Sequence, residues 1–372
     1  MRKKMQDSGP QQLFKCCFAL LFCGIVLLLC SCQSAAPAEK FERLFCWSSP
    51  SGELAAARYA EAGVTDIIVR NQKQYRWALK YGMTPYWHVF LPEGPHKQVM
   101  TPEEQKHFEY ISGKDLDKKM PYAERMKILH QRRREKKDLY GGDVKTEIAT
   151  LNNYQIACFS CDKDLTLTRK KLDSLLERAP DGVAGIHLDF VGYMNHNGCY
   201  CKGCLDRYSK YLNAQDLADT PKNKAVFYRD EMVSYYNAVI DYIKSRRKDF
   251  KVVVHVHPMF RSEPLYGNRT KADYCGQTVS WYFPWSQEKI RSYTRFVVDH
   301  AKDYHPHVQG IPFVGLSTDK SSSLGFKTPE QVDLELRTIL EAGGRKVMVC
   351  NGSSILQDGY FEVFKKYCGK KK

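Results

Sequence analysis

The residues with the clearest chemical meaning are five cysteines. Cys199, Cys201 and Cys204 stand in a Cys-x-Cys-x-x-Cys pattern, and Cys158 and Cys161 lie upstream of it. Four thiolates around a tetrahedral ion make a structural zinc site, and thiols at this spacing can share one metal. The pattern therefore predicts a structural zinc whose fourth ligand is Cys158 or Cys161.

Disulfide bonds are the alternative use of these thiols. They form in exported proteins, and the N-terminus, with Cys32 at the end of its apolar leader, predicts export. Nine cysteines follow Cys32, an odd number, so disulfides alone leave one thiol over. The adjacent thiols of a Cys-x-Cys pair also suit a shared metal better than two unstrained disulfides.

A second set of polar residues lies in apolar runs that predict β-strands. His187 and Asp189 alternate in one run, and His255 and His257 alternate in another, so each pair shares a face of its strand. A buried polar group without a partner costs about 1–3 kcal/mol, so these residues are expected to line a polar pocket. Other candidates for substrate contact at or near strand ends are Arg70, Trp87, His88, Tyr193, Trp281 and Asn351, with Trp47, Tyr282 and Trp285 as further aromatic residues.

A histidine inside a strand is more often a satisfied core residue, and each tryptophan is equally suited to fill the core. Several polar strand positions in register favour a pocket instead. Aromatic faces with a polar rim are the usual composition of such a site and suit stacking on sugar rings.

The elements that must position these residues alternate regularly along the chain. Strands are predicted at residues 44–48, 65–70, 84–91, 185–190, 251–258, 278–283, 310–316 and 346–350. Helices are predicted between most of them, at 51–62, 72–81, 222–247, 286–304 and 329–342. Such alternation implies a parallel sheet with right-handed crossovers, and eight units predict an α/β protein with a closed (β/α)₈ barrel. The alternative is an open doubly wound sheet, but no G-x-G-x-x-G follows the first strand.

One connection is far longer than the others. More than 90 residues separate the third and fourth strands, with helices predicted at 102–110, 121–140 and 165–178 and an extra strand at 154–159. We interpret residues 92–157 as an insertion that forms a lid or substrate platform at the C-terminal face.

The N-terminus has the pattern of a secretory signal. Arg2, Lys3, Lys4 and Lys15 precede an apolar run at 16–29 and then small residues. The run is shorter than the roughly 20 apolar residues of a membrane span. The alternative is a signal anchor that is never cleaved.

The ending Leu29-Cys30-Ser31-Cys32 resembles the bacterial lipobox. The resemblance implies lipidation of Cys32 and an exported, membrane-anchored lipoprotein, periplasmic or on the cell surface. The predicted organisation is a signal peptide at 1–31, a tether at 32–43, a single barrel domain at 44–368 and a basic tail at 369–372.

Charge indicates the kind of partner. Residues 1–31 contain four Lys or Arg and one Asp, so the remaining chain has 53 basic and 41 acidic residues, a net of +12. This suits an anionic polysaccharide, a phospholipid surface or nucleic acid, and export makes nucleic acid the least expected of the three. The basic runs at 114–137 and 370–372 also fit ordinary solvated surfaces.

The stretch 157–212 resembles the middle of bacterial family 42 β-galactosidases and related glycoside hydrolases. It contains GIHLDFVGYMNHNGCYCKGCLDRYSKYL, in which a strand with an acidic end precedes a Cys-Tyr-Cys-x-x-Cys cluster and an aromatic-rich helix. The resemblance implies a barrel, a structural zinc and hydrolysis of glycosidic bonds in a carbohydrate substrate.

This sequence departs from the family at the fourth strand. The β-galactosidases end that strand in Asn-Glu, with Glu as acid/base, whereas this chain has Leu188-Asp189. An Asp there is similar to the nucleophile of α-glycosidase barrels, so the family's substrate and stereochemistry do not carry over.

Glycoside hydrolysis normally requires two carboxyl groups across the scissile bond. Asp189 is the first candidate, and Glu263 or Asp319 is the expected partner, with Glu93 a further possibility. Two other functions remain open. A metal-dependent hydrolase would place a catalytic ion among His88, His187, Asp189, His255 and His257. A glycan-binding lipoprotein would use the same barrel without catalysis.

Overall fold

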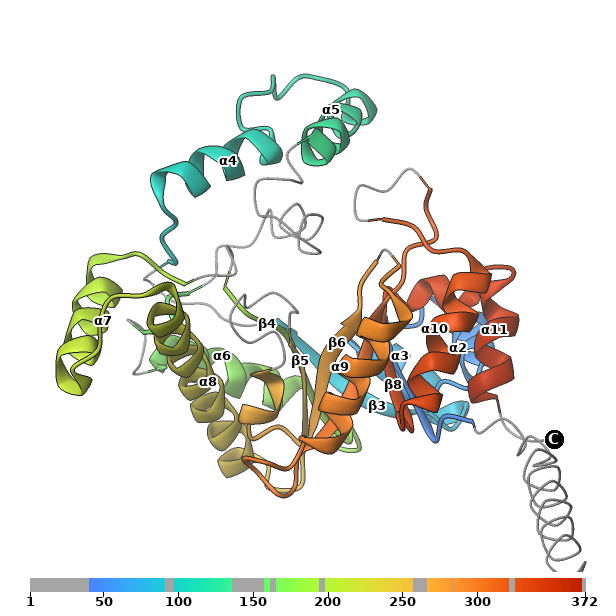
Figure 1. Ribbon diagram of the computed structural model, residues 1–372. Helices are drawn as coiled ribbons and strands as arrows, with labels where there is room; N and C mark the ends of the chain where they lie inside the picture. The colour runs from blue at the N-terminus through green and yellow to red at the C-terminus, as the bar shows by residue number, and fades with distance from the viewer. Residues whose placement is uncertain are drawn as a thin grey trace, which may run out of the picture. The chain divides into compact units, whose positions relative to one another are not determined.

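The computed structural model describes residues 40–90, 97–135, 157–160, 165–193, 198–256, 266–282, 284–320 and 325–369. Eight parallel strands close into a barrel in sequence order, with helices outside them (Figure 1), which confirms the predicted (β/α)₈ class. The strands are Arg43–Trp47 (β1), Asp66–Val69 (β2), Thr84–Phe90 (β3), Gly185–Val191 (β4), Lys251–Val256 (β5), Tyr274–Ser280 (β6), Gln309–Gly315 (β7) and Lys346–Cys350 (β8). Closure of the barrel leaves no free sheet edge. The unit that begins at Lys40 has its own hydrophobic core, so we expect it to fold without residues 1–39.

The helices follow the predicted pattern closely. They are Glu53–Glu61 (α2), Gln72–Lys80 (α3), Pro102–Ser112 (α4), Tyr122–Glu135 (α5), Thr166–Arg178 (α6), Lys202–Gln215 (α7), Pro221–Arg246 (α8), Gln287–Asp299 (α9), Pro329–Glu341 (α10) and Tyr360–Cys368 (α11), with short 3₁₀ helices at Tyr266–Arg269 (η3) and Gly352–Leu356 (η4). Local sequence explains several starts. Before α10, the Thr328 hydroxyl and the Gln331 side chain form a capping box, and Pro329 occupies the first turn.

The sixth strand differs from its prediction. It starts four residues earlier than expected, at Tyr274 rather than Thr278. Gly276 interrupts the apolar pattern there, and glycine within a strand often marks a close approach. A Cβ at Gly276 would lie 2.7 Å from the Met348 sulfur, so the barrel interior leaves no room for one. Half of the extra strand predicted at 154–159 lies outside the described residues, and Ala157 in the described half forms an antiparallel bridge with Lys97.

An ionic layer fills the N-terminal end of the barrel. Arg43 bonds Asp66 through Nε at 3.0 Å and reaches across the barrel to the Tyr274 hydroxyl at 2.6 Å. Asp66 is 1% exposed; burial raises the pKa of its carboxyl, and the Arg43 guanidinium acts in the opposite direction. Above this layer lie apolar residues that include Phe45, Val253 and Met348.

A buried ion pair ties β6, β7 and α10 together. The Lys327 Nζ donates to Glu335 Oε2 at 2.7 Å, to Ser280 Oγ at 2.8 Å and to the Gly315 carbonyl at 2.9 Å. A register shift between Thr278 and Ser280 accompanies the turn of Ser280 toward α10. Lys327 N–H also bonds the Ser317 carbonyl, so this lysine holds both ends of the loop that carries Asp319.

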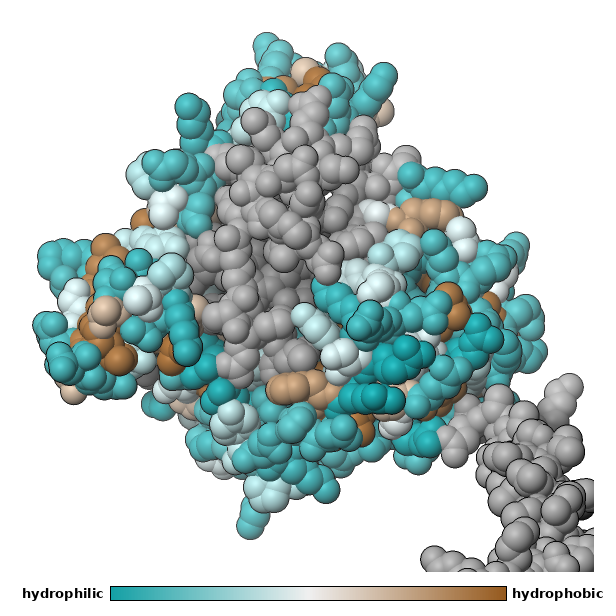
Figure 2. Space-filling view, viewed as in Figure 1, coloured by the Kyte–Doolittle hydropathy of each residue, from teal (hydrophilic) through white to brown (hydrophobic). Residues whose placement is uncertain are grey.

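Among the described residues, no helix is both long and apolar enough to cross a membrane. The coloured part of the face in Figure 2 is mostly hydrophilic, with hydrophobic residues in small separate groups. The predicted signal peptide and lipidation site Cys32 lie outside the described residues.

Replacing Lys327 by Met should destabilise the fold by about 3–5 kcal/mol, because Glu335 then remains buried without a cation. Urea denaturation of the chain from Lys40 onward measures the loss. The double variant Lys327→Met/Glu335→Leu should recover most of it, since both desolvated charges are then gone. Equal instability of the single and double variants would contradict this account.

Candidate active site and metal centre

Polar side chains from strands far apart in sequence meet at the C-terminal mouth of the barrel. In the parallel pairing of β3 with β4, His88 lies opposite His187, and Asp189 is two residues further along the same face. The His88 Nε2 is 3.3 Å from Asp189 Oδ2. The Asp189 side chain is 24% exposed, so its carboxylate is open to a ligand while remaining oriented by the imidazole.

His187 lies beneath this pair. It is 3% exposed, and its Nδ1 has no hydrogen-bond partner among the described residues. Burial holds the pKa of His187 well below its usual value, and the nearby His88 lowers it further. His187 is therefore neutral near pH 7, and its ring packs against Trp47 with centroids 5.0 Å apart.

Aromatic rings form the wall on the other side of the mouth. The Trp47 ring packs edge-on against His255 at 4.4 Å, and His255 stacks on Phe313 at 3.8 Å. His255 also lies 3.4 Å from the Thr278 hydroxyl. Trp281 is stacked parallel to His255 at 6.0 Å and is 4% exposed. The histidine thus belongs to an aromatic stack.

Cys350 joins the mouth at the end of β8. Its sulfur lies 3.0 Å from the Tyr282 hydroxyl. Burial raises the pKa of the Cys350 thiol to about 12, and the nearby Asp189 carboxylate adds to the increase. Sequence reasoning selected Asn351 instead. The alternation of Met348 and Cys350 along β8 was the signal that could have identified this thiol.

The structure does not bring every predicted residue to the mouth. Trp87 lies on the opposite face of β3 from His88, in the core between barrel and helices. Tyr193 is 1% exposed, and its hydroxyl donates to the Tyr228 carbonyl at 2.9 Å. Arg70, Asp319 and Asn351 are exposed residues that follow β2, β7 and β8. Three candidates, Glu93, His257 and Glu263, lie outside the described residues.

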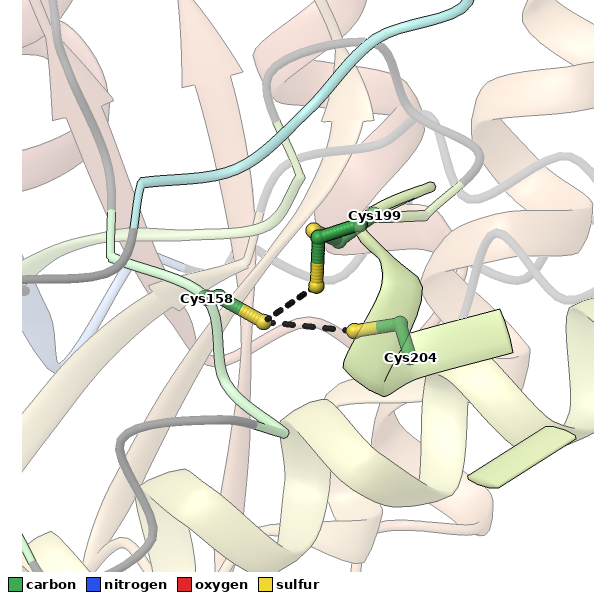
Figure 3. A group of neighbouring side chains, drawn as sticks. Cys158, Cys199 and Cys204 are labelled. Atoms are coloured by element: carbon green, nitrogen blue, oxygen red, sulfur yellow. Dashed lines mark hydrogen bonds between the residues drawn. The ribbon is translucent and has the colours of Figure 1, made fainter. Parts of the chain in front are cut away.

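Four predicted metal ligands do converge. The sulfurs of Cys158, Cys199, Cys201 and Cys204 all lie within 4.8 Å of one another. Cys158 Sγ is 3.2 Å from that of Cys204 and 3.9 Å from that of Cys201, and in Figure 3 it points toward Cys199 and Cys204. Tetrahedral zinc with bonds of about 2.3 Å requires sulfurs about 3.8 Å apart, whereas a disulfide requires about 2.05 Å. The four cysteines are free thiols with metal-site geometry, and Cys161 lies outside the described residues.

The surroundings of this four-cysteine cluster favour thiolates. Cys204 lies in the first turn of α7, where the helix dipole stabilises negative charge. The Val99 N–H donates to Cys199 Sγ at 3.3 Å, and the Tyr228 hydroxyl donates to the Cys199 carbonyl at 2.7 Å. The pKa of the Cys199 thiol is lowered, mainly because the thiols of Cys158 and Cys204 donate to its sulfur, whereas the pKa values of Cys158 and Cys204 are raised, so the negative charge is favoured on Cys199. Val99 and Tyr228 could not be identified from the sequence, because neither residue belongs to the cysteine motif.

The four-cysteine cluster also connects separate parts of the chain. The Val99 carbonyl accepts from the Tyr200 N–H at 2.9 Å, so the start of the insertion lies against the Cys-x-Cys segment. Cys158 joins from the end of the insertion, next to the bridge of Lys97 with Ala157. A Cβ at Gly198 would lie 2.4 Å from the Tyr228 ring, which explains a glycine before the first cysteine of the motif.

Within the described part of the chain, the four cysteines form the one group of three or more side chains close enough to hold a metal. His88, His187, Asp189 and His255 do not form such a group, although they face the same mouth. The geometry therefore gives no support to a catalytic metal among these residues.

Fold and site together define a (β/α)₈ barrel with a four-cysteine centre, and solved structures share this fold. A β-galactosidase from the Antarctic haloarchaeon Halorubrum lacusprofundi shares the fold at a TM-score of 0.51 and 14% identity, over 87% of this chain and 57% of that enzyme. A family 42 β-galactosidase from G. stearothermophilus gives 0.46 and 8%, over 90% and 60% of the two chains. Bee venom hyaluronidase gives 0.44 and 9%, over 88% and 96%.

The chain spans less than two thirds of the length of either β-galactosidase. No protein-family model and no curated protein sequence matches it. The similarity thus shows the fold.

Changing Cys199 to Ser should remove the metal, because three thiolates and a hydroxyl bind zinc far less well than four thiolates. Elemental analysis should find about one metal per chain in the wild type and little in the variant. Cys275→Ser, which alters a buried thiol outside the cluster, should keep its metal. Full metal content in Cys199→Ser, or a disulfide detected by mass spectrometry between any two of the four, would contradict the assignment.

Acid should destabilise the protein partly through His187. Its folded-state pKa lies well below the unfolded value near 6.5, so the unfolded chain takes up the proton first as pH falls. Stability from this residue is complete above pH ~6.5 and declines below it, by at most about 1.4 kcal/mol per pH unit. Urea denaturation between pH 7.5 and 5 should therefore show a steeper decline for the wild type than for His187→Gln. The exposed His300→Gln serves as control and should follow the wild type.

Proposed function

We propose that this protein is a glycoside hydrolase that acts on an oligosaccharide or polysaccharide through Asp189. The observation that carries the proposal is the position of that carboxylate. It lies at the C-terminal end of β4, is partly exposed, and is oriented by His88 at 3.3 Å. Catalytic groups of (β/α)₈ enzymes lie at these strand ends, and a carboxylate beside aromatic rings suits an oxocarbenium-like transition state.

The walls of the mouth fit a sugar. Trp47 and Tyr282 are partly exposed and supply ring surface, and His88 supplies a polar group beside Asp189. The H. lacusprofundi protein that shares the fold is a β-galactosidase, which agrees with a carbohydrate ligand. The excess of basic residues favours an anionic glycan among possible substrates.

A second carboxylate completes the mechanism in our proposal. Asp319 is exposed on the loop after β7, and the Lys327 contacts hold the ends of that loop. Glu263, on the connection after β5, is the other candidate. The carboxyl that carries a proton would donate it to the leaving oxygen, and the other would attack the sugar or activate water.

The four-cysteine cluster would hold a structural zinc. All four positions of a tetrahedral ion are then taken by thiolates, so no open position is left for substrate. In this proposal the metal holds the segment between β4 and α7 against both ends of the insertion. That segment follows Asp189 in the sequence.

The proposed setting is outside the cytoplasm. The apolar leader and the lipobox-like ending at Cys32 support export and lipidation. The protein would then meet glycans of the envelope or the surroundings, not nucleic acid.

The test is hydrolysis of aryl glycosides and of neutral and anionic glycans by the chain from Lys40 onward. Asp189→Asn should lower kcat by about 10²–10⁴-fold without loss of metal or stability, because it removes only the charge. Asp181→Asn, an exposed residue before β4, should leave kcat unchanged. The variants Asp319→Asn and Glu263→Gln identify the second catalytic carboxyl. Only one of them should lower kcat as much as Asp189→Asn does.

A non-catalytic glycan-binding protein is the second candidate. Asp189 lies at the mouth beside His88, whereas Asp319 is exposed on the loop after β7, so the structure does not pair the two carboxylates across the mouth. Binding of a glycan by wild type and Asp189→Asn alike, with no turnover of any substrate by the folded wild type, would establish this function and reject the hydrolase.

A further inference from the structure

The end of β6 breaks the alternation of side chains along that strand. Thr278 faces the barrel interior and pairs with Phe313 of β7. Ser280 pairs with Val314, the next residue of β7, so β6 carries one extra residue, Val279, at this point. An extra residue of this kind is a β-bulge, and it reverses the faces of the side chains that follow it.

The bulge decides which residue enters the barrel mouth. With regular alternation Ser280 would face the interior and Trp281 would face the helices. Instead Ser280 faces α10, and Trp281 packs inside the barrel with its ring stacked on Phe313 at 5.9 Å. Tyr282 follows and is partly exposed, with its ring 4.6 Å from that of Trp281 and its hydroxyl 3.0 Å from the Cys350 sulfur. The position of the Trp281–Tyr282 pair therefore depends on the bulge.

A buried polar network holds the bulge from the outer side of the barrel. Ser280 is fully buried, and its hydroxyl donates to Glu335 Oε1 at 2.9 Å and accepts from Lys327 Nζ at 2.8 Å. The same ammonium donates to the Gly315 carbonyl at the end of β7, at 2.9 Å. Glu335 belongs to α10, so one hydroxyl on β6 is connected to β7 and to α10 at once.

Close packing against β7 fixes the same pair from a second direction. A Cβ at Gly315 would lie 2.9 Å from the carbonyl carbon of Trp281 and 2.9 Å from the nitrogen of Tyr282. Both are backbone atoms, which cannot move aside as the end of a flexible side chain can. The glycine thus allows the backbone of the Trp281–Tyr282 pair to lie directly against β7.

We propose that Ser280, held by Lys327 and Glu335, is a positioning residue that sets the Trp281–Tyr282 pair in the mouth and thereby the affinity for substrate. The inference rests on the proposed function, in which the Tyr282 ring packs on a sugar. A buried ion pair adds little net stability, so holding β6 in one register is the use that suits this geometry.

The network should affect binding more than bond cleavage. Ser280 faces away from the interior on β6, whereas Asp189 lies at the end of β4 and is oriented by His88. A displaced aromatic pair would weaken contact with the sugar and leave the carboxylate in place.

The test uses Ser280→Ala and Gly315→Ala in the chain from Lys40 onward. Both variants keep the Lys327–Glu335 ion pair, whose loss would threaten the fold. Hydrogen exchange, followed by mass spectrometry, should be about tenfold faster or more at the amides of residues 278–282 in each variant. The first variant removes the hydrogen bonds of the bulge, and the second pushes the pair away from β7. No substrate is needed for this readout.

Kinetics with the aryl glycoside that the wild type hydrolyses fastest supply the second readout. KM should rise roughly tenfold in both variants, while kcat should stay within about twofold of the wild-type value, because Asp189 and His88 are unchanged.

The matched control is Thr338→Val in the same helix as Glu335. Thr338 is 1% exposed, and its hydroxyl donates to the Leu334 carbonyl at 2.8 Å, so this variant also loses a buried hydrogen bond. It should leave KM and the exchange at residues 278–282 unchanged, since it does not touch the bulge.

Similar changes in Thr338→Val would show a general loss of stability and overturn the proposal. Unchanged exchange at residues 278–282 in Ser280→Ala would do the same, and so would faster exchange with an unchanged KM. If the folded wild type hydrolyses no substrate, the proposed hydrolase fails, and hydrogen exchange alone still decides whether the network positions the pair.

Discussion

Closure of eight parallel strands is the constraint on which the rest of this structure depends. Each strand must point alternate side chains inward, and all strands must end at the same rim. Trp47, His88, Asp189 and His255 are therefore neighbours although the sequence separates them widely. The opposite end is filled by the buried pair of Arg43 and Asp66, which leaves the rim as the open end of the barrel interior.

The barrel alone does not position the long insertion, and the four-cysteine cluster supplies that restraint. Cys158 comes from the end of the insertion and Val99 from its start, while Cys199 and Cys204 belong to the segment after β4. These contacts act together with the bridge of Lys97 with Ala157 and the hydrogen bond from the Gln98 side chain to the Ala157 carbonyl. Cys199 and Cys201 follow Asp189 closely in the sequence. The conformation of the four-cysteine cluster therefore influences the position of the proposed catalytic carboxylate.

The strand and helix pattern could be predicted from sequence because alternation and capping are local properties. All eight strands appear where the apolar runs predicted them, apart from β6, whose inward Gly276 broke the pattern. The cysteine motif was equally local. Cys158 could be proposed as a ligand from its type alone, but its convergence with Cys199, Cys201 and Cys204 required the fold.

Facing directions at the strand ends were harder to predict. Trp87 and His88 are adjacent, yet only His88 turns into the barrel, and an aromatic residue fits either face of a strand. Tyr193 lies just beyond β4, where alternation no longer applies, and it packs under the cysteines instead. Cys350 was not predicted as a site residue, because a single cysteine in an apolar strand belongs to no recognisable sequence motif. Long-range contacts decided all three positions.

The bridge between Lys97 and Ala157 has an evolutionary consequence. Because the two ends of the insertion meet there, the residues between them form a closed excursion from the barrel. Lengthening such a loop costs little free energy, since the closure term grows only with the logarithm of its length. Related chains can therefore exchange, extend or shorten this segment while the strands and the cysteines stay in place, which makes it the natural place for new specificities to arise on an unchanged barrel.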